Sequence, residues 1–289
     1  MELTLEELRN IVRSLDGRRS NKFVKSLEDR KQKEADFHDR KHSELREAQQ
    51  SEAMDTYEAI YSNRKYYRAV AACMNYKSEW VRNEIKGKVY LDYCCGIGGT
   101  AIEAAKAGAT LVIGVDVSAY SLGRAEERAR EAGVADRCIF IQADAENTGL
   151  PNNCLDRLIC NGVLHHLDIR HAFPELSRIM KPGGKALAVE ALDYNPAIKA
   201  YRMLTPDIRT EWEKVHILSL KDVKFARKYF DVPKVRFWHI TGIAGPHLPK
   251  FMQPILNGFD RVLEKIPFVQ LMAWMFTFEM IKPHSTADG

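Results

Sequence analysis

A glycine-rich turn directly after an apolar strand is the feature of this sequence with the clearest chemistry. The run Val89-Tyr-Leu-Asp-Tyr-Cys-Cys-Gly-Ile-Gly-Gly-Thr-Ala101 passes through Gly96 and Gly98 into a helical pattern. Glycines leave room for a ligand to approach the backbone, and the amides that open the following helix point toward it. A second apolar run, Leu111–Val115, ends in Asp116, at the spacing where a carboxylate can bind both ribose hydroxyls. These elements predict an adenosine site.

Three further apolar runs end in residues that can contact a ligand. The first, Cys138–Asp144, ends in an acid that can accept a hydrogen bond from an adenine amino group. The second, Leu155–Asn161, leads into His165-His166-Leu, and the third, Lys185–Glu190, follows Lys-Pro-Gly-Gly. The glycine turn alone also fits the G-x-G-x-x-A pattern of NAD or FAD sites, so the later strand ends have to decide between the cofactors.

In order and spacing, residues 89–190 resemble the class I S-adenosylmethionine-dependent methyltransferases. The resemblance is carried by the run from Asp92 to Gly98, the strand ends at Asp116 and Asp144, the His-His-Leu and the Lys-Pro-Gly-Gly. It implies an α/β fold with a doubly wound, seven-stranded, mostly parallel sheet (the Rossmann-like methyltransferase fold), and S-adenosyl-L-methionine as cofactor. The family usually has glycine where Cys94 stands, so we expect altered packing near the methionine portion of the cofactor, with binding retained.

The reaction that this resemblance implies needs alignment and, for some acceptors, a base. Methyl transfer from a sulfonium is an in-line displacement, in which the protein mainly orients the reactants and excludes water. A hydroxyl acceptor must also lose its proton near the transition state. We favour His165 or His166 near the methyl group and His216 as a more speculative base, against the alternative that each histidine is only hydrogen-bonded to backbone. Glu190 can orient the acceptor or stabilise positive charge.

The remaining candidate site residues follow the same strand ends and the flanking helices. The candidate cofactor-binding residues are Tyr67, Asp92, Cys94, Gly96, Gly98, Asp116, Ser118, Asp144, Ala145 and Asn161. The candidate substrate-binding residues are Tyr66, Tyr194, Tyr201, Arg209 and Trp212. The apolar and aromatic content of this second set favours an acceptor with an apolar body. We expect no metal ion.

The chain is predicted to have a helical N-terminal arm and lid at 1–88, then the cofactor-binding domain at 89–289. Substrate-recognition insertions are expected at about 191–218 and 241–272. Thr4 and Glu7 predict a capping box for a first helix that ends near Gly17. A second, polar helix from Ser20 to about Ala53 is either a solvated arm or an arm exchanged between subunits. In related methyltransferases such helices fold over the cofactor mouth, and Tyr66 or Tyr67, in a third helical region, is placed there.

Composition excludes several other classes. Lys and Arg number 43 and Asp and Glu 39, a net charge of +4 without a sustained basic run, so nucleic acid is not expected as substrate. The first residues show no secretory signal, and six cysteines without a C-x-x-C pair indicate reduced thiols of a cytoplasmic protein. The apolar run 267–281 is too short for a membrane span and contains Glu279; its end, 274–281, fits an antiparallel seventh strand. Contact of residues 248–268 with a membrane surface stays open.

We therefore expect an S-adenosylmethionine-dependent methyltransferase that modifies O or N of a small, largely apolar metabolite or natural product, in a homo-oligomer assembled through the N-terminal helices. One alternative is C-methylation of a prenyl alkene through a carbocation. Two others come from different classes: a catalytically silent scaffold with this fold, and an NAD-dependent oxidoreductase. The set Asp92, Asp116 and Asp144 argues against the scaffold, and the strand ends at Asp144 and His-His-Leu, taken together, argue against the oxidoreductase.

Overall fold

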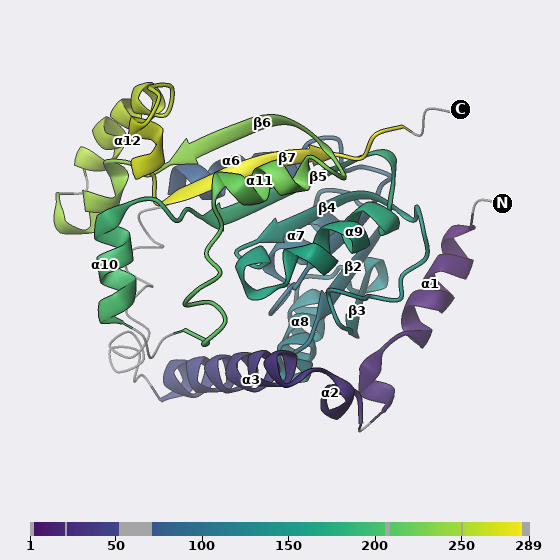
Figure 1. The fold of residues 1–289 in the computed structure, drawn as a ribbon. Coiled ribbons are helices and arrows are strands. Elements are labelled where there is room, and N and C mark those ends of the chain that lie inside the picture. The colour runs from purple at the N-terminus through teal and green to yellow at the C-terminus, as the bar shows by residue number, and fades with distance from the viewer. Residues whose placement is uncertain (1–2, 21, 52–70, 206–208, 250, 285–289) are drawn as a thin grey trace.

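A seven-stranded sheet in the order β3-β2-β1-β4-β5-β7-β6 organises the chain (Figure 1). The computed structural model describes residues 3–20, 22–51, 71–205, 209–249 and 251–284. The strands are β1 (Val89–Tyr93), β2 (Leu111–Asp116), β3 (Cys138–Gln142), β4 (Leu155–Asn161), β5 (Met180–Ala191), β6 (Asp231–Trp238) and β7 (Met275–Ile281). Strands β1 to β5 pair in parallel, whereas β7 runs antiparallel to both β5 and β6. The predicted mostly parallel, doubly wound sheet is confirmed.

Helices cover both faces of this sheet, which explains why its strands read as almost continuous apolar runs. One face carries α6 (Ala71–Arg82), α7 (Gly99–Lys106) and α8 (Ala119–Glu131); the other carries α1 (Leu5–Ser14), α9 (Ile169–Ile179) and α11 (Leu220–Ala226). Strand β1 shows the alternation, since Tyr90 packs in the first layer and Leu91 and Tyr93 in the second. In Figure 1, α9 and α11 lie in front of the strands and α6 lies behind them.

Local signals placed most element ends within a few residues. The capping box of α1 is present, with the Glu7 amide donating to Thr4 Oγ1 over 3.3 Å and the Thr4 amide donating to Glu7 Oε2 over 2.9 Å. The Lys181–Gly184 turn lies inside β5, where Gly183 has a φ of 74° and the pairing with β4 shifts register. The predicted turn is therefore present as an irregularity within β5, which is longer than the predicted strand.

The polar N-terminal segment differs from its prediction. Instead of one helix from Ser20, it forms α2 (Phe23–Ser26) and the long α3 (Asp29–Gln50), separated by the extended backbone at Leu27. Helix α3 packs on α8 of the same chain and buries Ala35 and Phe37, so it is not a solvated arm. Its exchange between subunits and the division at residue 88 stay predictions. Tyr66 and Tyr67 of the third helical region lie outside the described residues.

Two helical insertions interrupt the C-terminal half. Helix α10 (Pro196–Leu204) begins after Asn195, whose Oδ1 accepts a hydrogen bond from the Ala197 amide over 2.9 Å. Helix α12 (Met252–Leu263) lies in the connection from β6 to β7. Among the described helices, none combines the length and the apolar content that crossing a membrane requires.

Candidate active site

A cavity of about 330 Å³ lies where the parallel strands end. Its wall includes the loop between β1 and α7, where the chain turns sharply from strand to helix. Three residues of this loop have left-handed backbone, with φ of 55° at Cys94, 50° at Gly96 and 72° at Gly98. Glycine adopts this conformation readily, whereas Cys94 does so at a conformational cost. Ligand pockets of open α/β sheets lie at this edge.

Two buried carboxylates at strand ends hold the loop. Asp92 Oδ2 accepts from the Ala101 amide over 2.8 Å and so fixes the start of α7. Asp116 accepts from the Gly96 amide over 2.7 Å with one oxygen and from the Ser118 amide over 2.9 Å with the other. Burial raises the pKa of both carboxyls, that of Asp92 to about 7. Both line the cavity, so the strand ends build one polar wall around it.

The raised pKa of Asp92 predicts a pH dependence of stability. The folded state keeps the proton to about pH 7 because the pKa of Asp92 is raised, whereas the unfolded chain releases it near the ordinary aspartate pKa of 3.8. Stability therefore falls as the pH rises through this window. The nearest charges are Lys77 and Asp116. Asp92→Asn removes the buried charge and keeps an acceptor for Ala101. We expect the free energy of unfolding of this variant to exceed that of the parent by an amount that increases with pH. Between acidic pH and pH 8 the difference should grow by up to about 4 kcal/mol, as measured by urea unfolding. With the exposed Asp136→Asn the difference should stay constant with pH.

Helix α3 forms the wall opposite the strand ends. Its Asp39 accepts a short hydrogen bond from the Ser118 hydroxyl and another, of 3.3 Å, from the Tyr120 amide. One turn further along, His42 Nδ1 lies 2.5 Å from Ser121 Oγ. Burial and the nearby Lys41 lower the pKa of His42 to about 4, so its imidazole is neutral at physiological pH. Two residues of α3, Asp39 and His42, thus bind the start of α8 and hold this wall of the cavity beside Asp116.

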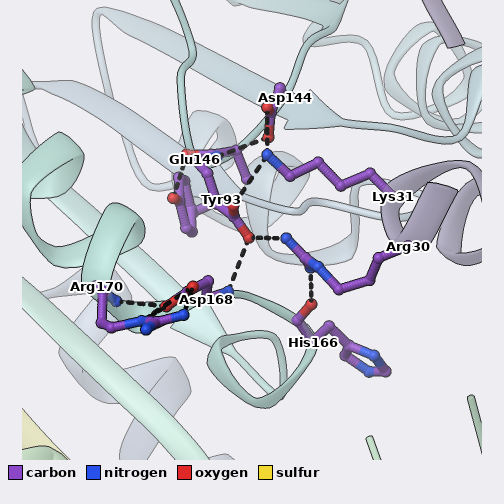
Figure 2. Close-up of polar contacts among 9 residues, drawn as sticks. Arg30, Lys31, Tyr93, Asp144, Glu146, His166, Asp168 and Arg170 are labelled. Atoms are coloured by element: carbon purple, nitrogen blue, oxygen red, sulfur yellow. Dashed lines mark hydrogen bonds and ion pairs between the residues drawn. The ribbon is translucent and has the colours of Figure 1, made fainter. Parts of the chain in front are cut away.

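A second attachment of α3 centres on the buried Glu146 (Figure 2). Its carboxylate binds Arg30 over 2.5 Å, Lys31 over 2.9 Å and the Asp168 amide over 2.8 Å. Lys31 also binds Asp144 Oδ2 over 2.7 Å, at the strand end expected to meet adenine. Arg30 and Lys31 of α3 are therefore held by carboxylates that follow β3. Helix α3 is fixed to the rest of the chain and is not a free arm.

The two histidines after β4 are each paired with a glutamate. His165 Nδ1 lies 2.7 Å from Glu190 Oε2, and the other oxygen of Glu190 accepts from the Val163 and Leu164 amides over 2.9 and 2.8 Å. Burial would lower the pKa of His165, but the charge and hydrogen bond of Glu190 outweigh it and the pKa is raised. Because Glu190 is fully buried and its oxygens are engaged, it positions His165 and does not face an acceptor.

His166 is paired with Glu34 of α3. Its Nδ1 lies 3.1 Å from Glu34 Oε2, and the Thr210 hydroxyl donates to Glu34 Oε1 over 2.5 Å. Burial opposes ionisation of Glu34, but the hydrogen bond and charge of His166 and the hydrogen bond of Thr210 outweigh it, and the pKa of Glu34 is lowered. An ionised carboxylate can only accept, so the proton of neutral His166 sits on Nδ1 and leaves Nε2 to take a proton. His166 also lines the cavity.

The structure brings most of the predicted cofactor residues to this cavity. Asp92, Cys94, Gly96, Asp116, Asp144, Ala145 and Asn161 line it. Gly98 serves packing instead, since a Cβ there would approach the Ala125 Cβ to 2.8 Å. Ser118 is buried behind the wall, where its side chain caps α8. Tyr67 lies outside the described residues. Sequence reasoning missed Arg30, Lys31, Glu34, Lys41 and His42, which also line the cavity.

The described members of the predicted acceptor set do not line the cavity. The Tyr194 hydroxyl accepts from the Leu220 amide over 3.2 Å, and Trp212 lies under the Arg30 guanidinium at 4.4 Å. Arg209 is buried, bonds Thr205 and lies 5.9 Å from the Tyr201 ring. His216 is exposed and stacks on Trp212 at 3.5 Å. Its place at the surface does not suit a base, so we drop this role. Tyr66 lies outside the described residues.

The chemistry of the cavity fits an adenosine-containing cofactor. Carboxylates at the ends of β1 and β2 and after β3 line one continuous space, next to a loop with left-handed backbone at Gly96. The volume lies within the range of small-molecule pockets. A side chain at Gly96 would be strained by its φ of 50°, although a Cβ would meet only the His42 ring at 3.6 Å. Asp116 has both oxygens at the strand end where a ribose is bound in such sheets.

Comparison with known proteins agrees with this geometry. Residues 91–184 match a family model described as a methyltransferase domain. A sterol 24-C-methyltransferase of Gibberella zeae is 32% identical over 99 residues, which cover 34% of this chain and 26% of the relative. A 27-O-demethylrifamycin SV methyltransferase of Amycolatopsis mediterranei is 36% identical over 100 residues, 34% of this chain and 37% of the relative. The matched segments thus span well under half the length of these relatives.

A solved structure extends the similarity of fold beyond this segment. Geranyl diphosphate C-methyltransferase from Streptomyces coelicolor, in complex with Mg²⁺, geranyl diphosphate and S-adenosyl-L-homocysteine, superposes with a TM-score of 0.54 at 17% identity. The alignment covers 72% of this chain and 79% of that chain. At this identity the match supports the fold and not the substrate.

Proposed function

Because the chain belongs to the class I S-adenosylmethionine-dependent methyltransferases, with its methyltransferase domain at residues 91–184, we propose that it transfers a methyl group to O or N of a small, largely apolar acceptor. The observation that supports this best is the position of His166. Its ring lines the same cavity as Asp92, Asp116 and Asp144, and Glu34 orients it.

The bound cofactor would supply a methyl group on a positively charged sulfur. Asp116 and Asp144 would hold its adenosine part, and the left-handed loop at Gly96 would lie against the remainder. Helix α3 forms one wall of this space and is held there by Asp39 and His42. His166 Nε2 would accept the proton of an acceptor hydroxyl as its oxygen takes the methyl group and the thioether leaves. For an amine acceptor it would take the proton from the ammonium before the nitrogen attacks. Glu34 would then stabilise the imidazolium that results.

The contacts of Glu190 and Arg209 help to decide between O- or N-methylation and C-methylation. The C-methylation alternative relies on Glu190 facing a carbocation, but Glu190 is fully buried against His165 and two amides. A diphosphate acceptor would need free cations at the mouth, whereas Arg209 bonds Thr205 and lies 3.5 Å from Glu213. These contacts support proton removal from O or N over carbocation chemistry.

Acceptor screening by mass spectrometry tests this proposal. The purified chain and S-adenosylmethionine are incubated with two matched panels, one of apolar molecules that carry a hydroxyl or amine and one of prenyl alkenes without either. We expect a gain of one methyl group in the first panel only. Methylation confined to the alkenes would replace the proposal with C-methylation.

The cytoplasmic location, the homo-oligomeric state and the absence of nucleic acid as a partner stay predictions from the sequence. The helix α3 that was expected to join subunits is engaged with its own chain through Arg30, Lys31, Asp39 and His42. If oligomers form, we therefore propose that the outward sides of the N-terminal helices carry the contact.

A further inference from the structure

Helix α12 exposes its apolar side and turns its polar side to the protein, the reverse of an ordinary surface helix. The polar stripe consists of Gln253, Asn257, Asp260 and Glu264. Asp260 is buried and accepts from the Thr241 amide and hydroxyl, both over 2.7 Å, and Glu264 binds Arg236 over 2.8 Å. These bonds fix the rotation of the helix about its axis.

The opposite stripe is apolar and faces solvent. Phe251, Ile255, Phe259 and Val262 follow at intervals of four, four and three residues, which places them on one side of the helix. Phe251 is 70% exposed, Phe259 60% and Val262 61%. Beyond the helix, Phe268 is 83% exposed and Ile266 is also exposed. Single exposed apolar residues are common, but a run of this size on one side marks an interaction surface. We call these six residues the α12 apolar face.

The charges beside this face favour an anionic partner. From Phe251 to Met272, every residue is described, and the exposed charged ones are Arg261 and Lys265. The acidic residues of the segment, Asp260 and Glu264, are turned inward onto Thr241 and Arg236. An amphipathic helix with aromatic residues on one side and basic residues at its edge is the pattern of helices that lie in the interface of a bilayer.

The segment lies at the ligand edge of the sheet. In the register of the strands, Ala191 at the end of β5 pairs with Met275 at the start of β7, and Trp238 at the end of β6 pairs with the same Met275. The connection that carries α12 therefore leaves and re-enters the sheet at the edge where β1 to β5 end (Figure 1). Residues at the ends of β1, β2 and β4 also line the cavity. A partner on the α12 apolar face would lie at the edge where an acceptor enters.

We propose that the α12 apolar face docks on the surface of a bilayer that contains anionic phospholipids. Phe251, Ile255, Phe259 and Val262 enter the boundary between headgroups and acyl chains, and Arg261 and Lys265 contact the phosphates. The chain is then peripheral, held on one surface, and an apolar acceptor can pass from the lipid to the cavity without crossing bulk water. The last step rests on the proposed function; the docking does not.

Vesicle co-sedimentation of the full chain without S-adenosylmethionine tests the docking separately from methyl transfer. The probes are vesicles of phosphatidylcholine alone and of equal parts phosphatidylcholine and phosphatidylglycerol. We expect partition into the mixed vesicles at low salt, reduced at least about tenfold in the double variant Phe259→Ser/Phe268→Ser. Arg261→Gln/Lys265→Gln should lose the preference for the anionic vesicles, as should the parent at high salt.

The control is Leu3→Ser, which removes another exposed apolar side chain near α1, on the opposite side of the molecule from α12 in Figure 1. It should bind vesicles as the parent does, and circular dichroism should show all variants folded. The proposal is overturned if the parent does not sediment with anionic vesicles or if the Phe double variant binds equally well. It is also overturned if sedimentation velocity without lipid shows a dimer that the Phe double variant abolishes, because the face would then be a subunit interface.

Discussion

Glu146→Gln is expected to lower the free energy of unfolding by about 3 to 5 kcal/mol, because removing one partner of a buried ion pair leaves charge uncompensated. Glu146 is buried and binds Arg30 and Lys31 of α3 as well as the Asp168 amide. The neutral amide keeps the shape and one acceptor but removes the charge that faces both cations. Urea unfolding followed by circular dichroism measures the difference.

The matched control is Glu211→Gln. Its carboxylate pairs with Lys214 over 2.5 Å but is 87% exposed, so the same substitution should cost at most about 1 kcal/mol. Equal effects of the two substitutions would show that the Glu146 ion pairs do not hold α3 in place as a wall of the cavity.

His166→Ala is expected to lower kcat by about 10²- to 10⁴-fold with an acceptor identified by the screen, because that is the typical contribution of a positioned general base. Its ring lines the cavity and its Nδ1 is held by Glu34. His216→Ala is the control, since this histidine is exposed and stacked on Trp212. A loss of activity in His216→Ala equal to that in His166→Ala would contradict the assignment.

Glu34→Gln tests whether Glu34 acts through His166. Without the carboxylate the imidazolium of His166 loses its stabilising charge, so the pH at which activity rises should move downward and kcat should fall less than in His166→Ala. The other groups around this pair are His38, His165 and Thr210. A lower kcat with an unchanged pH profile would indicate a purely structural Glu34.

The sheet and its acidic strand ends were predictable because their signals are local. Apolar runs, glycine turns and the residue that follows each strand specify β1 to β4 and place Asp92, Asp116 and Asp144 at one edge. The parallel register then brings these ends together without further information. The same reasoning could not show that Gly98 allows close packing against Ala125, because a glycine that packs and a glycine that makes room for a ligand look alike in sequence.

The contributions of α3 and α12 were not predictable in this way. Helix α3 is polar on every side, so no apolar stripe indicates which residues face the cavity, and Glu34 meets His166 across 132 positions of sequence. Helix α12 has a clear apolar stripe, which would ordinarily be assigned to the core. The contacts of Asp260 and Glu264, together with the exposure of the stripe itself, show that it faces outward.

Calorimetric titration with S-adenosylhomocysteine and, separately, with NAD tests the central claim most directly. We predict micromolar binding of S-adenosylhomocysteine and no binding of NAD. Asp116→Ala should weaken the first by at least about tenfold, the effect of losing a charge-assisted hydrogen bond. Asp116→Asn, which keeps acceptors for the Gly96 and Ser118 amides, separates loss of the ribose contact from collapse of the loop. Tighter binding of NAD, or no binding of S-adenosylhomocysteine by the folded parent, would contradict the account.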